Sequence, residues 1–579
     1  MPAAAPAFTL VRAGRVACRI VVPAKAAPVV RHAAEELRRL VALMSGATLP
    51  IAEEGAGGDG PAVYLGPTRK AAGLLASGGK PSAEDGVAIR TAGRDLVLSG
   101  GNGRARLYAV YVLLEKWLGV RFLAHDCTVV PKRSTVTLPE INYTYAPPFM
   151  YREALYWDAY PKETAAPQRL NGPATKCDEA TGGKVAFFPY VHSFCKLVPP
   201  EKYYAEHPEY FSLVGGKRTN LTIHGQLCLT NPEVLRIATA QAMAWIRENP
   251  EIPIIDISQN DGEGACECDA CVAVEREEES KHGPILRFVN AIADDVKREH
   301  PDKWVETLAY AYSTKPPGKT RPRDNVIIRL CHAGCYHHGF EACGLGANLT
   351  TYLEGWRKLT RRIFIWHYAA NFAHYIAPNF NLQGLAADLK AYPRYGVNGV
   401  MVQADHQGPG GELAELRQYL VAQLLWDPTG DPMEIRREFC AGYYGPAASD
   451  VEAYLALVDA EGARKEVHAF GAWDPTGTVR PEFVARGLEV LAGAREKCSD
   501  EAVRNRVDKL MLPHWYAQLQ WPDKYALSAA DAPALVAKFR RVVERNQITY
   551  IREDFNSPSM PGWLAEMEKR YPTQGRKTP

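Results

Sequence analysis

The chain of 579 residues carries 68 Lys plus Arg and 66 Asp plus Glu, so its formal net charge is only +2. This balance gives no electrostatic reason to expect nucleic acid or an anionic membrane surface as a partner. The length exceeds what one hydrophobic core usually supports, which predicts two to four domains. No stretch has the roughly 18 or more consecutive apolar residues of a membrane span.

The first six residues lack the charged and apolar regions of a signal peptide. Taken as it stands, the sequence predicts a cytoplasmic protein, whereas a trimmed sequence would be compatible with a secreted or periplasmic one. The 13 cysteines are an odd number and lack the spacing of a small disulfide scaffold, which argues against a full disulfide framework.

Residues 1–145 predict a small α+β domain. The stretches 27–44 and 104–118 place apolar residues at helical spacing, so each should bury one face. Strand-like stretches lie around them at 17–23, 62–66, 86–91 and 95–99.

From residue 146 to 430, short apolar segments alternate with helical ones, which is the pattern of βα units around a parallel sheet. The eight strand candidates are 149–157, 189–194, 226–231, 253–260, 304–312, 326–332, 362–368 and 398–404. Helical patterns between several of them occupy 232–247, 283–299, 349–360, 382–392 and 412–426. Eight strands with intervening helices predict a (β/α)₈ TIM-like barrel.

After residue 430 the strand signals stop. Helical patterns follow at 432–442, 448–464, 480–497, 500–520 and 533–546. Residues 431–579 should therefore form a helical region that packs against the barrel. The predicted fold class is α/β: a (β/α)₈ barrel preceded by a small α+β domain and followed by a helical C-terminal region.

Polar or aromatic side chains end nearly every predicted barrel strand. In a (β/α)₈ enzyme the active site lies at the C-terminal ends of the strands. The candidate substrate-binding residues at these ends are Trp157, His192, Asn231, Asn260, Tyr310, Tyr312, His332, Trp366, His367 and Gln403. A purely structural barrel would not need polar groups at so many ends, so their convergence predicts a functional site. For His192 and His332, a structural role stays open.

Three carboxylates are placed for acid–base chemistry at the same end. Asp261 and Glu263 follow the fourth strand on a glycine-rich turn, and Asp405 follows the eighth strand. Glycoside hydrolysis usually needs an acid that protonates the leaving oxygen and a second group that stabilises or attacks the oxocarbenium-like centre. We expect Asp261 or Glu263 to be the acid, and Asp405 to be the second group or to orient a sugar hydroxyl. The alternatives are that Asp261 caps its turn, that Glu263 faces solvent and that Asp405 lies in a surface turn.

Cys266, Cys268 and Cys271 follow directly, and three thiols so close together can bind zinc with a fourth ligand from elsewhere. The segment 331–338 offers candidates for that ligand in Cys331, His332, Cys335, His337 and His338. The spacing is not the paired pattern of a structural zinc site, so a metal site, a disulfide and free thiols all stay open. We expect that the protein requires no cofactor. If zinc binds, we expect it to hold loops together rather than to take part in catalysis.

Several motifs resemble the bacterial domain-of-unknown-function family numbered 4838. They are His192-Ser193-Phe194, Pro199-Pro200-Glu201-Lys202-Tyr203-Tyr204, His207-Pro208-Glu209-Tyr210-Phe211, Gln226-Leu227-Cys228-Leu229-Thr230-Asn231-Pro232, Asn260-Asp261-Gly262 with its cysteine cluster, and Ala414-Glu415-Leu416-Arg417. The resemblance covers roughly residues 150–430. Some members of that family belong to glycoside hydrolase family 163, endo-β-N-acetylglucosaminidases that act on complex N-glycans. Residues 107–111 and 119–122 look like the accessory domain that precedes the barrels of β-hexosaminidases and α-glucuronidases.

The resemblance implies a glycosidase acting on an oligosaccharide or glycan, with the acetamido group of a β-N-acetylhexosaminide as one candidate nucleophile. Relatives often carry Asp where this chain has His367, and Glu-Gln where it has Val402-Gln403. If those carboxylates are catalytic in relatives, this chain uses Asp261 or Asp405 instead, has another substrate, or has lost activity. The alternative functions are a non-catalytic glycan-binding protein on the same barrel and a metal-dependent hydrolase centred on the Cys and His loops.

Overall fold

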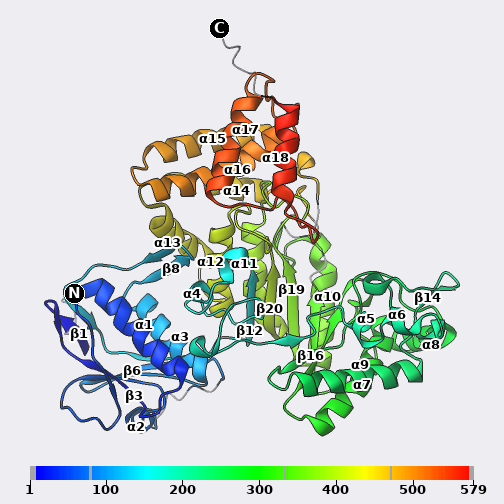
Figure 1. The fold of residues 1–579 in the computed structure, drawn as a ribbon, viewed down its shortest axis with the longest axis horizontal. Coiled ribbons are helices and arrows are strands. Elements are labelled where there is room, and N and C mark those ends of the chain that lie inside the picture. Colours follow the sequence, from blue (N-terminus) through cyan, green and yellow to red (C-terminus); the bar gives the residue numbers. More distant parts are fainter. Residues whose placement is uncertain are drawn as a thin grey trace.

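A computed structural model of the protein describes residues 8–76, 81, 83–331, 334–335, 337–469 and 473–572. A strand-rich N-terminal region, a curved parallel sheet with its helices, and a C-terminal set of helices follow one another in chain order (Figure 1). This arrangement confirms the predicted fold class. The domain limits at 145/146 and 430/431 stay a prediction.

The N-terminal region is built on a six-stranded sheet in the order β11-β6-β7-β5-β3-β4. Its strands are β3 (Arg19–Val22), β4 (Ile51–Glu53), β5 (Ala62–Leu65), β6 (Val87–Ala92), β7 (Asp95–Gly100) and β11 (Asn142–Tyr145). Helices α1 (Pro28–Ser45) and α3 (Gly103–Lys116) contact each other and the sheet. The shorter elements are β1 (Phe8–Arg12), β2 (Arg15–Val16), α2 (Arg69–Leu75), β8 (Arg121–Ala124), β9 (Cys127–Val129) and β10 (Val136–Leu138).

The central sheet is parallel throughout and has seven strands in the order β12-β20-β19-β18-β17-β16-β13. They are β12 (Tyr151–Leu155), β13 (Phe187–Phe188), β16 (Ile254–Asp256), β17 (Trp304–Ala309), β18 (Val326–Cys331), β19 (Ile363–Tyr368) and β20 (Val397–Gln403). In the described part of the chain, β12 and β13 form its two edges, so this barrel is open between them.

One of the eight predicted strands, 226–231, the third in chain order, does not join this sheet. Its backbone pairs instead with the segment 210–212: the Ser212 amide donates to the Gln226 carbonyl at 2.9 Å, and the Cys228 amide donates to the Tyr210 carbonyl at 2.9 Å. The apolar pattern of this segment therefore reflects burial within a long excursion between β13 and β16. That excursion also contains α5 (Phe194–Leu197), α6 (Pro200–Tyr203), β14 (Leu213–Val214) and β15 (Lys217–Arg218).

Helices follow most of the barrel strands, as α/β architecture requires. They are α7 (Pro232–Glu248), α8 (Asp269–Glu278), α9 (His282–Glu299), α10 (Ala347–Leu359), α11 (Leu382–Ala391) and α12 (Ala414–Trp426), with the short α4 (Lys162–Ala165) after β12. The C-terminal region consists of α13 (Pro432–Tyr444), α14 (Ala448–Gly462), α15 (Pro481–Glu496), α16 (Glu501–Gln520), α17 (Ala532–Arg545) and α18 (Ser559–Arg570).

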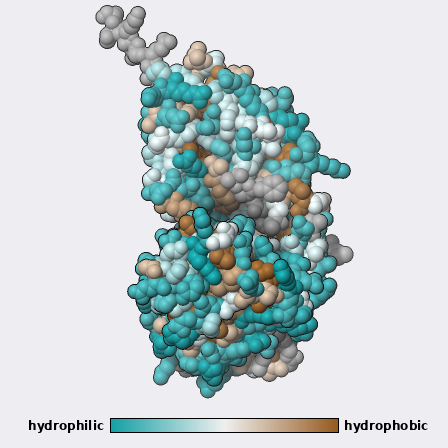
Figure 2. All heavy atoms as spheres, turned by 90° about the vertical axis from the view of Figure 1, so that its right-hand side faces the viewer, coloured by the Kyte–Doolittle hydropathy of each residue, from teal (hydrophilic) through white to brown (hydrophobic). Residues whose placement is uncertain are grey.

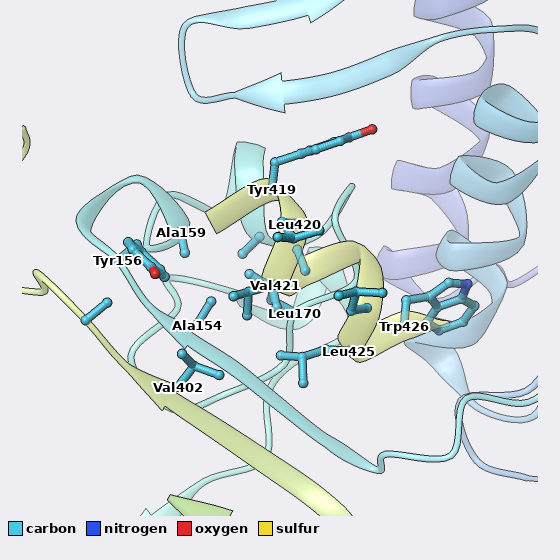
Figure 3. Close-up of a cluster of buried hydrophobic side chains, with 14 of the residues drawn as sticks. Ala154, Tyr156, Ala159, Leu170, Val402, Tyr419, Leu420, Val421, Leu425 and Trp426 are labelled. Atoms are coloured by element: carbon cyan, nitrogen blue, oxygen red, sulfur yellow. The ribbon is translucent and has the colours of Figure 1, made fainter. Parts of the chain in front are cut away.

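Helix α12 links the three regions because it is buried on nearly all sides. Its polar side chains Arg417 and Gln418 are buried together with the apolar ones. Leu420, Val421 and Leu425 of α12 gather on the side of Ala154 of β12 and Val402 of β20 (Figure 3). Tyr419 points away from these strands, and its ring packs against Phe439 of α13. At its end, the Trp426 ring meets Tyr108 of α3 edge-on, with 5.7 Å between ring centroids. Helix α12 also contacts α13.

The interior of the barrel is layered. An apolar layer contains Tyr151, Val185, Phe187, Ile254, Ile327, Phe364 and Met401. The next residues facing inward are charged: the Arg329 guanidinium lies 2.8 Å from the Glu306 carboxylate, and neither side chain is exposed. The Arg329 cation also lies over the rings of Phe187 and Tyr151, at 4.6 and 5.3 Å from their centroids. Burial raises the pKa of Glu306, whereas the charge of Arg329 lowers it.

The face of the molecule that carries the excursion and α7 to α9 is largely hydrophilic (Figure 2). Within the described ranges, no helix combines the length and the apolar character that crossing a membrane requires.

We expect Arg329→Met to destabilise the protein strongly, because it leaves Glu306 buried without its cation. Removing one partner of a buried ion pair typically costs about 3–5 kcal/mol. Replacing both partners, with Arg329→Met and Glu306→Leu, should recover much of the loss. Urea unfolding followed by fluorescence measures this, with Arg298→Met in the surface pair Arg298–Asp295 as the control. Equal losses for Arg329→Met and Arg298→Met would contradict the argument.

Candidate active site

A cavity of about 700 Å³ opens at the C-terminal ends of the barrel strands. Each of the seven strands, or the loop after it, contributes to its lining, as expected for an active site on this architecture. Five residues predicted from the sequence line this cavity: His192, Asp261, Tyr310, Trp366 and Gln403. Whether they bind substrate stays a prediction, but the structure does bring them to one place.

Asp261 lies in a turn that is clamped on both sides by one buried side chain. The Gln226 amide nitrogen donates to the carbonyls of Asn260 and Gly262, at 3.0 and 3.2 Å, and its oxygen accepts from the Asn260 amide at 3.0 Å. Gly262 has a φ of +155°, and a Cβ there would lie 3.1 Å from the His224 carbonyl oxygen. Glycine therefore lets the turn pass close to that backbone.

The side chain of Asp261 is oriented by Tyr310, whose hydroxyl donates to the Asp261 carboxylate at 3.1 Å. His192 lies beside Tyr310, with 6.0 Å between ring centroids. The Nδ1 of His192 is 2.9 Å from the Gln259 carbonyl, which fixes the proton on Nδ1 and leaves Nε2 as an acceptor. Burial lowers the pKa of His192, so the ring is held neutral.

A second carboxyl, Glu553, enters the cavity from the C-terminal region. It lies between α17 and α18, in a segment held by the loops after β19 and β20. The Glu553 amide donates to the Phe372 carbonyl at 2.8 Å, and the Tyr375 amide donates to the Ile551 carbonyl at 2.7 Å. The Gln403 amide donates to the Glu553 carboxylate at 3.2 Å.

The two carboxyls interact electrostatically across the cavity. Burial raises the pKa of Glu553, the hydrogen bond from Gln403 lowers it, and the negative charge of Asp261 raises it further. Like charges in one site favour protonation of one member of the pair. Glu553 is therefore the member of this pair better suited to hold a proton.

Aromatic rings form the walls of the cavity. Trp366 donates from its indole nitrogen to the Gln403 side-chain oxygen at 2.8 Å, which fixes the ring plane. Tyr190 lies 6.4 Å from Trp366 between ring centroids, and Phe555 at the rim is 81% exposed. Flat apolar faces with polar edges suit the alternating CH and OH groups of a sugar ring.

The other two predicted catalytic carboxylates lie elsewhere. Glu263 is exposed and does not line the cavity. Asp405 is buried beside a second, smaller cavity of about 260 Å³, which Trp157 also lines. The Asp405 carboxylate accepts from the Gly411 amide at 3.1 Å, and burial raises its pKa to about 8.

Three predicted substrate-binding residues have structural contacts instead. His367 lies between Trp366 and Tyr368 on β19, and because side chains alternate along a strand it faces outward, where Nδ1 is 2.8 Å from the Tyr392 hydroxyl. Asn231 caps α7 by accepting from the Glu233 amide at 2.9 Å. The Asn260 side chain accepts from the Cys195 amide at 3.0 Å.

Tyr312 lies beside the cysteine cluster rather than in the large cavity. His332 lies outside the described residues. Cys266, Cys268 and Cys271 lie together with Cys228, and not with any described candidate of the segment 331–338.

Sequence reasoning missed Glu553 and Phe555 because they belong to no barrel strand. It also missed Glu153, a buried inward-facing residue of β12 that lines the cavity. Glu153 had a usable signal, since strand alternation places it on the same face as Tyr151 and Leu155. Glu553 had none.

Comparison with known proteins agrees with this fold. The family model described as "Domain of unknown function (DUF4838)" matches residues 122–456, more than half of the chain. The chain is similar in structure to a family GH115 4-O-methyl-α-glucuronidase with specificity for decorated arabinogalactans. The TM-score is 0.53 at 12% identity, covering 97% of this chain and 77% of that one. A GH138 enzyme targeting pectin rhamnogalacturonan II gives a TM-score of 0.43 at 11% identity, covering 95% and 78%. No curated protein sequence matches this chain.

The raised pKa of Asp405 predicts a pH-dependent gain in stability for Asp405→Asn. The unfolded carboxyl ionises near pH 4 and the folded one near pH 8, so the free energy of unfolding falls between about pH 4 and 8. Asparagine cannot ionise, so the variant does not lose stability as the pH rises, and its side-chain oxygen still accepts from the Gly411 amide. Thermal melts should therefore show a larger Tm gain over wild type at pH 8 than at pH 5. The exposed variant Asp302→Asn is the control, and a gain independent of pH would contradict the prediction.

Proposed function

We propose that this chain, which belongs to the DUF4838 family, is a glycoside hydrolase that uses Glu553 and Asp261. The observation that carries the proposal is the meeting of these two carboxyls in one ring-lined cavity at the C-terminal end of the barrel. They come from positions nearly 300 residues apart in the sequence. The likeness to a GH115 enzyme supports the same kind of fold.

In this proposal Glu553 is the general acid. A glycosidic oxygen must gain a proton as it leaves, and a carboxyl with a raised pKa keeps that proton near neutral pH. Burial and the charge of Asp261 both raise the pKa of Glu553. Two hydrogen bonds in series, from Trp366 to Gln403 and from Gln403 to Glu553, hold the acid near the Trp366 ring, on which a sugar ring would stack.

Asp261 is the second carboxylate. Its turn is immobilised by Gln226 and its side chain by Tyr310. A fixed carboxylate stabilises an oxocarbenium-like transition state, attacks the anomeric carbon, or orients an acetamido group that attacks in its place. The resemblance to family 163 favours the third role, with a β-N-acetylhexosaminide as substrate.

The charge of the cavity favours a neutral sugar. Three carboxyls line it, those of Glu153, Asp261 and Glu553, whereas none of the described lining residues is lysine or arginine. A uronic acid would bring its own carboxylate into this field without a cation to pair with. This chain therefore differs in expected substrate from the α-glucuronidase that shares its fold. A glycan-binding protein without activity is the rival function.

Glu553→Gln should lower kcat by about 10²- to 10⁴-fold on substrates with poor leaving groups, because general acid catalysis is lost. Aryl glycosides with good leaving groups should be affected much less. The wild type should lose activity as pH rises through the pKa of Glu553, since the acid must be protonated, and the variant should lack this limb. A panel of nitrophenyl glycosides and N-glycans supplies the substrates.

Glu566→Gln, an exposed position on α18, is the matched control for that experiment. An unchanged kcat and pH profile in Glu553→Gln would remove Glu553 as the acid. Binding of glycans by the wild type with no hydrolysis of any substrate would favour the binding-protein alternative.

Asp261→Asn should abolish turnover while folding and sugar binding stay nearly intact, because the amide keeps the shape but not the charge. Calorimetry of sugar binding and a thermal melt, run beside the kinetic assay, separate catalysis from structure. Full activity in this variant would exclude Asp261 from the chemistry. The exposed neighbour Glu263→Gln, outside the cavity, should behave as wild type.

A further inference from the structure

Two groups of four Cys and His side chains lie outside the large cavity. Within the described residues, Cys228, Cys266, Cys268 and Cys271 form what we call the thiol cluster, and Cys335, His338, Cys343 and His468 form the mixed cluster. In each, all four donor atoms lie within 4.8 Å of one another. Both sets match donor combinations that bind zinc, Cys₄ and Cys₂His₂.

The spacings in the thiol cluster fit a tetrahedral ion. Zinc–sulfur bonds of about 2.3 Å place any two sulfurs of a tetrahedral site about 3.8 Å apart. The Sγ of Cys228 lies 3.6 Å from that of Cys268 and 4.0 Å from that of Cys271. These are nearly twice the sulfur–sulfur bond length of a disulfide, about 2.05 Å.

The mixed cluster fits the same geometry with two nitrogens. Zinc–nitrogen bonds of about 2.0–2.1 Å place sulfur and nitrogen ligands about 3.6 Å apart. Nδ1 of His338 lies 3.7 Å from Sγ of Cys335, and Nδ1 of His468 lies 3.7 Å from Sγ of Cys343. His468 Nδ1 is also 3.4 Å from Cys335 Sγ.

The tautomer of His338 points independently to a ligand at the mixed cluster. Nε2 of His338 is 3.2 Å from the Arg464 carbonyl, which can only accept, so the proton belongs on Nε2. The lone pair of Nδ1 then faces the cluster. Metal-binding histidines commonly donate their second nitrogen to a backbone carbonyl in this way.

The thiol cluster has donors arranged to support negative sulfur. The Leu213 amide donates to Cys266 Sγ at 3.4 Å, and the Arg218 guanidinium lies 3.7 Å from the same sulfur. Cys268 is the N-cap of α8, where the positive end of the helix favours a thiolate. Thiolates are the form in which cysteine binds zinc.

We propose that each cluster binds one Zn²⁺ in a closed, structural site. The zinc of the thiol cluster joins the segment after Gln226 to the segment after Asp261. It therefore holds Gln226 in place beside the turn of Asp261, to which Gln226 is hydrogen-bonded. The zinc of the mixed cluster joins the loop after β18 to the chain after α14, and so fastens the C-terminal region to the barrel. Neither cluster lines the large cavity, so metal binding does not depend on the proposed hydrolysis.

Elemental analysis of the purified full chain tests the proposal. The wild type should carry two zinc ions per chain, and Cys266→Ser with Cys271→Ser should carry one. Cys335→Ser with Cys343→Ser should likewise carry one. Cys195→Ser, a half-buried cysteine in neither cluster, is the matched control and should keep both ions.

A second measurement covers variants that fold poorly. Wild-type protein stripped with a chelator should melt at a lower temperature and regain its Tm on adding Zn²⁺ alone. Co²⁺ should give the intense visible bands of tetrahedral thiolate coordination. Wild type that carries no zinc and whose Tm does not respond to Zn²⁺ would overturn the proposal. So would an intact mass that has lost the hydrogens of disulfides within the clusters.

Discussion

The buried cation of Arg329 sets the interior of the barrel on which the candidate site is built. A guanidinium without exposure needs a countercharge and polarisable surroundings, and Glu306 with the rings around it supplies both. Two of these rings, Tyr190 and Trp366, are also walls of the cavity above. Trp366 donates to Gln403, and Gln403 donates to Glu553, so a series of contacts connects the proposed acid to the buried ion pair.

The sequence was sufficient for the architecture because apolar periodicity is a local property. Strands such as 326–331 and helices such as 232–248 are recognisable from their own residues, and the strand-end rule then located Asp261 and Trp366. The strand-end rule also selected His367, because it takes no account of the alternation of side chains along a strand. Trp366 and His367 are neighbours on one strand, so only one of them can face the cavity.

What could not be predicted depends on contacts between distant segments. Glu553 reaches the cavity only because its segment bonds to the loops after β19 and β20, and nothing in its own neighbourhood signals this. Cys228 and Cys266 are likewise brought together by the segment 210–213, because the Cys228 amide donates to the Tyr210 carbonyl and the Glu267 amide donates to the Leu213 carbonyl. The predicted strand 226–231 was wrong because the backbone partner of this segment lies in the excursion rather than in the sheet.

The entry of Glu553 from the far end of the chain has an evolutionary consequence. The matched family region ends at residue 456, so this carboxyl lies about 100 residues beyond it, on a part of the chain that the family model does not include. Recombination that exchanged the C-terminal helices would exchange the proposed acid with them while leaving Asp261 in place. One barrel could in this way acquire new chemistry from an appended bundle, without a single substitution in its strands.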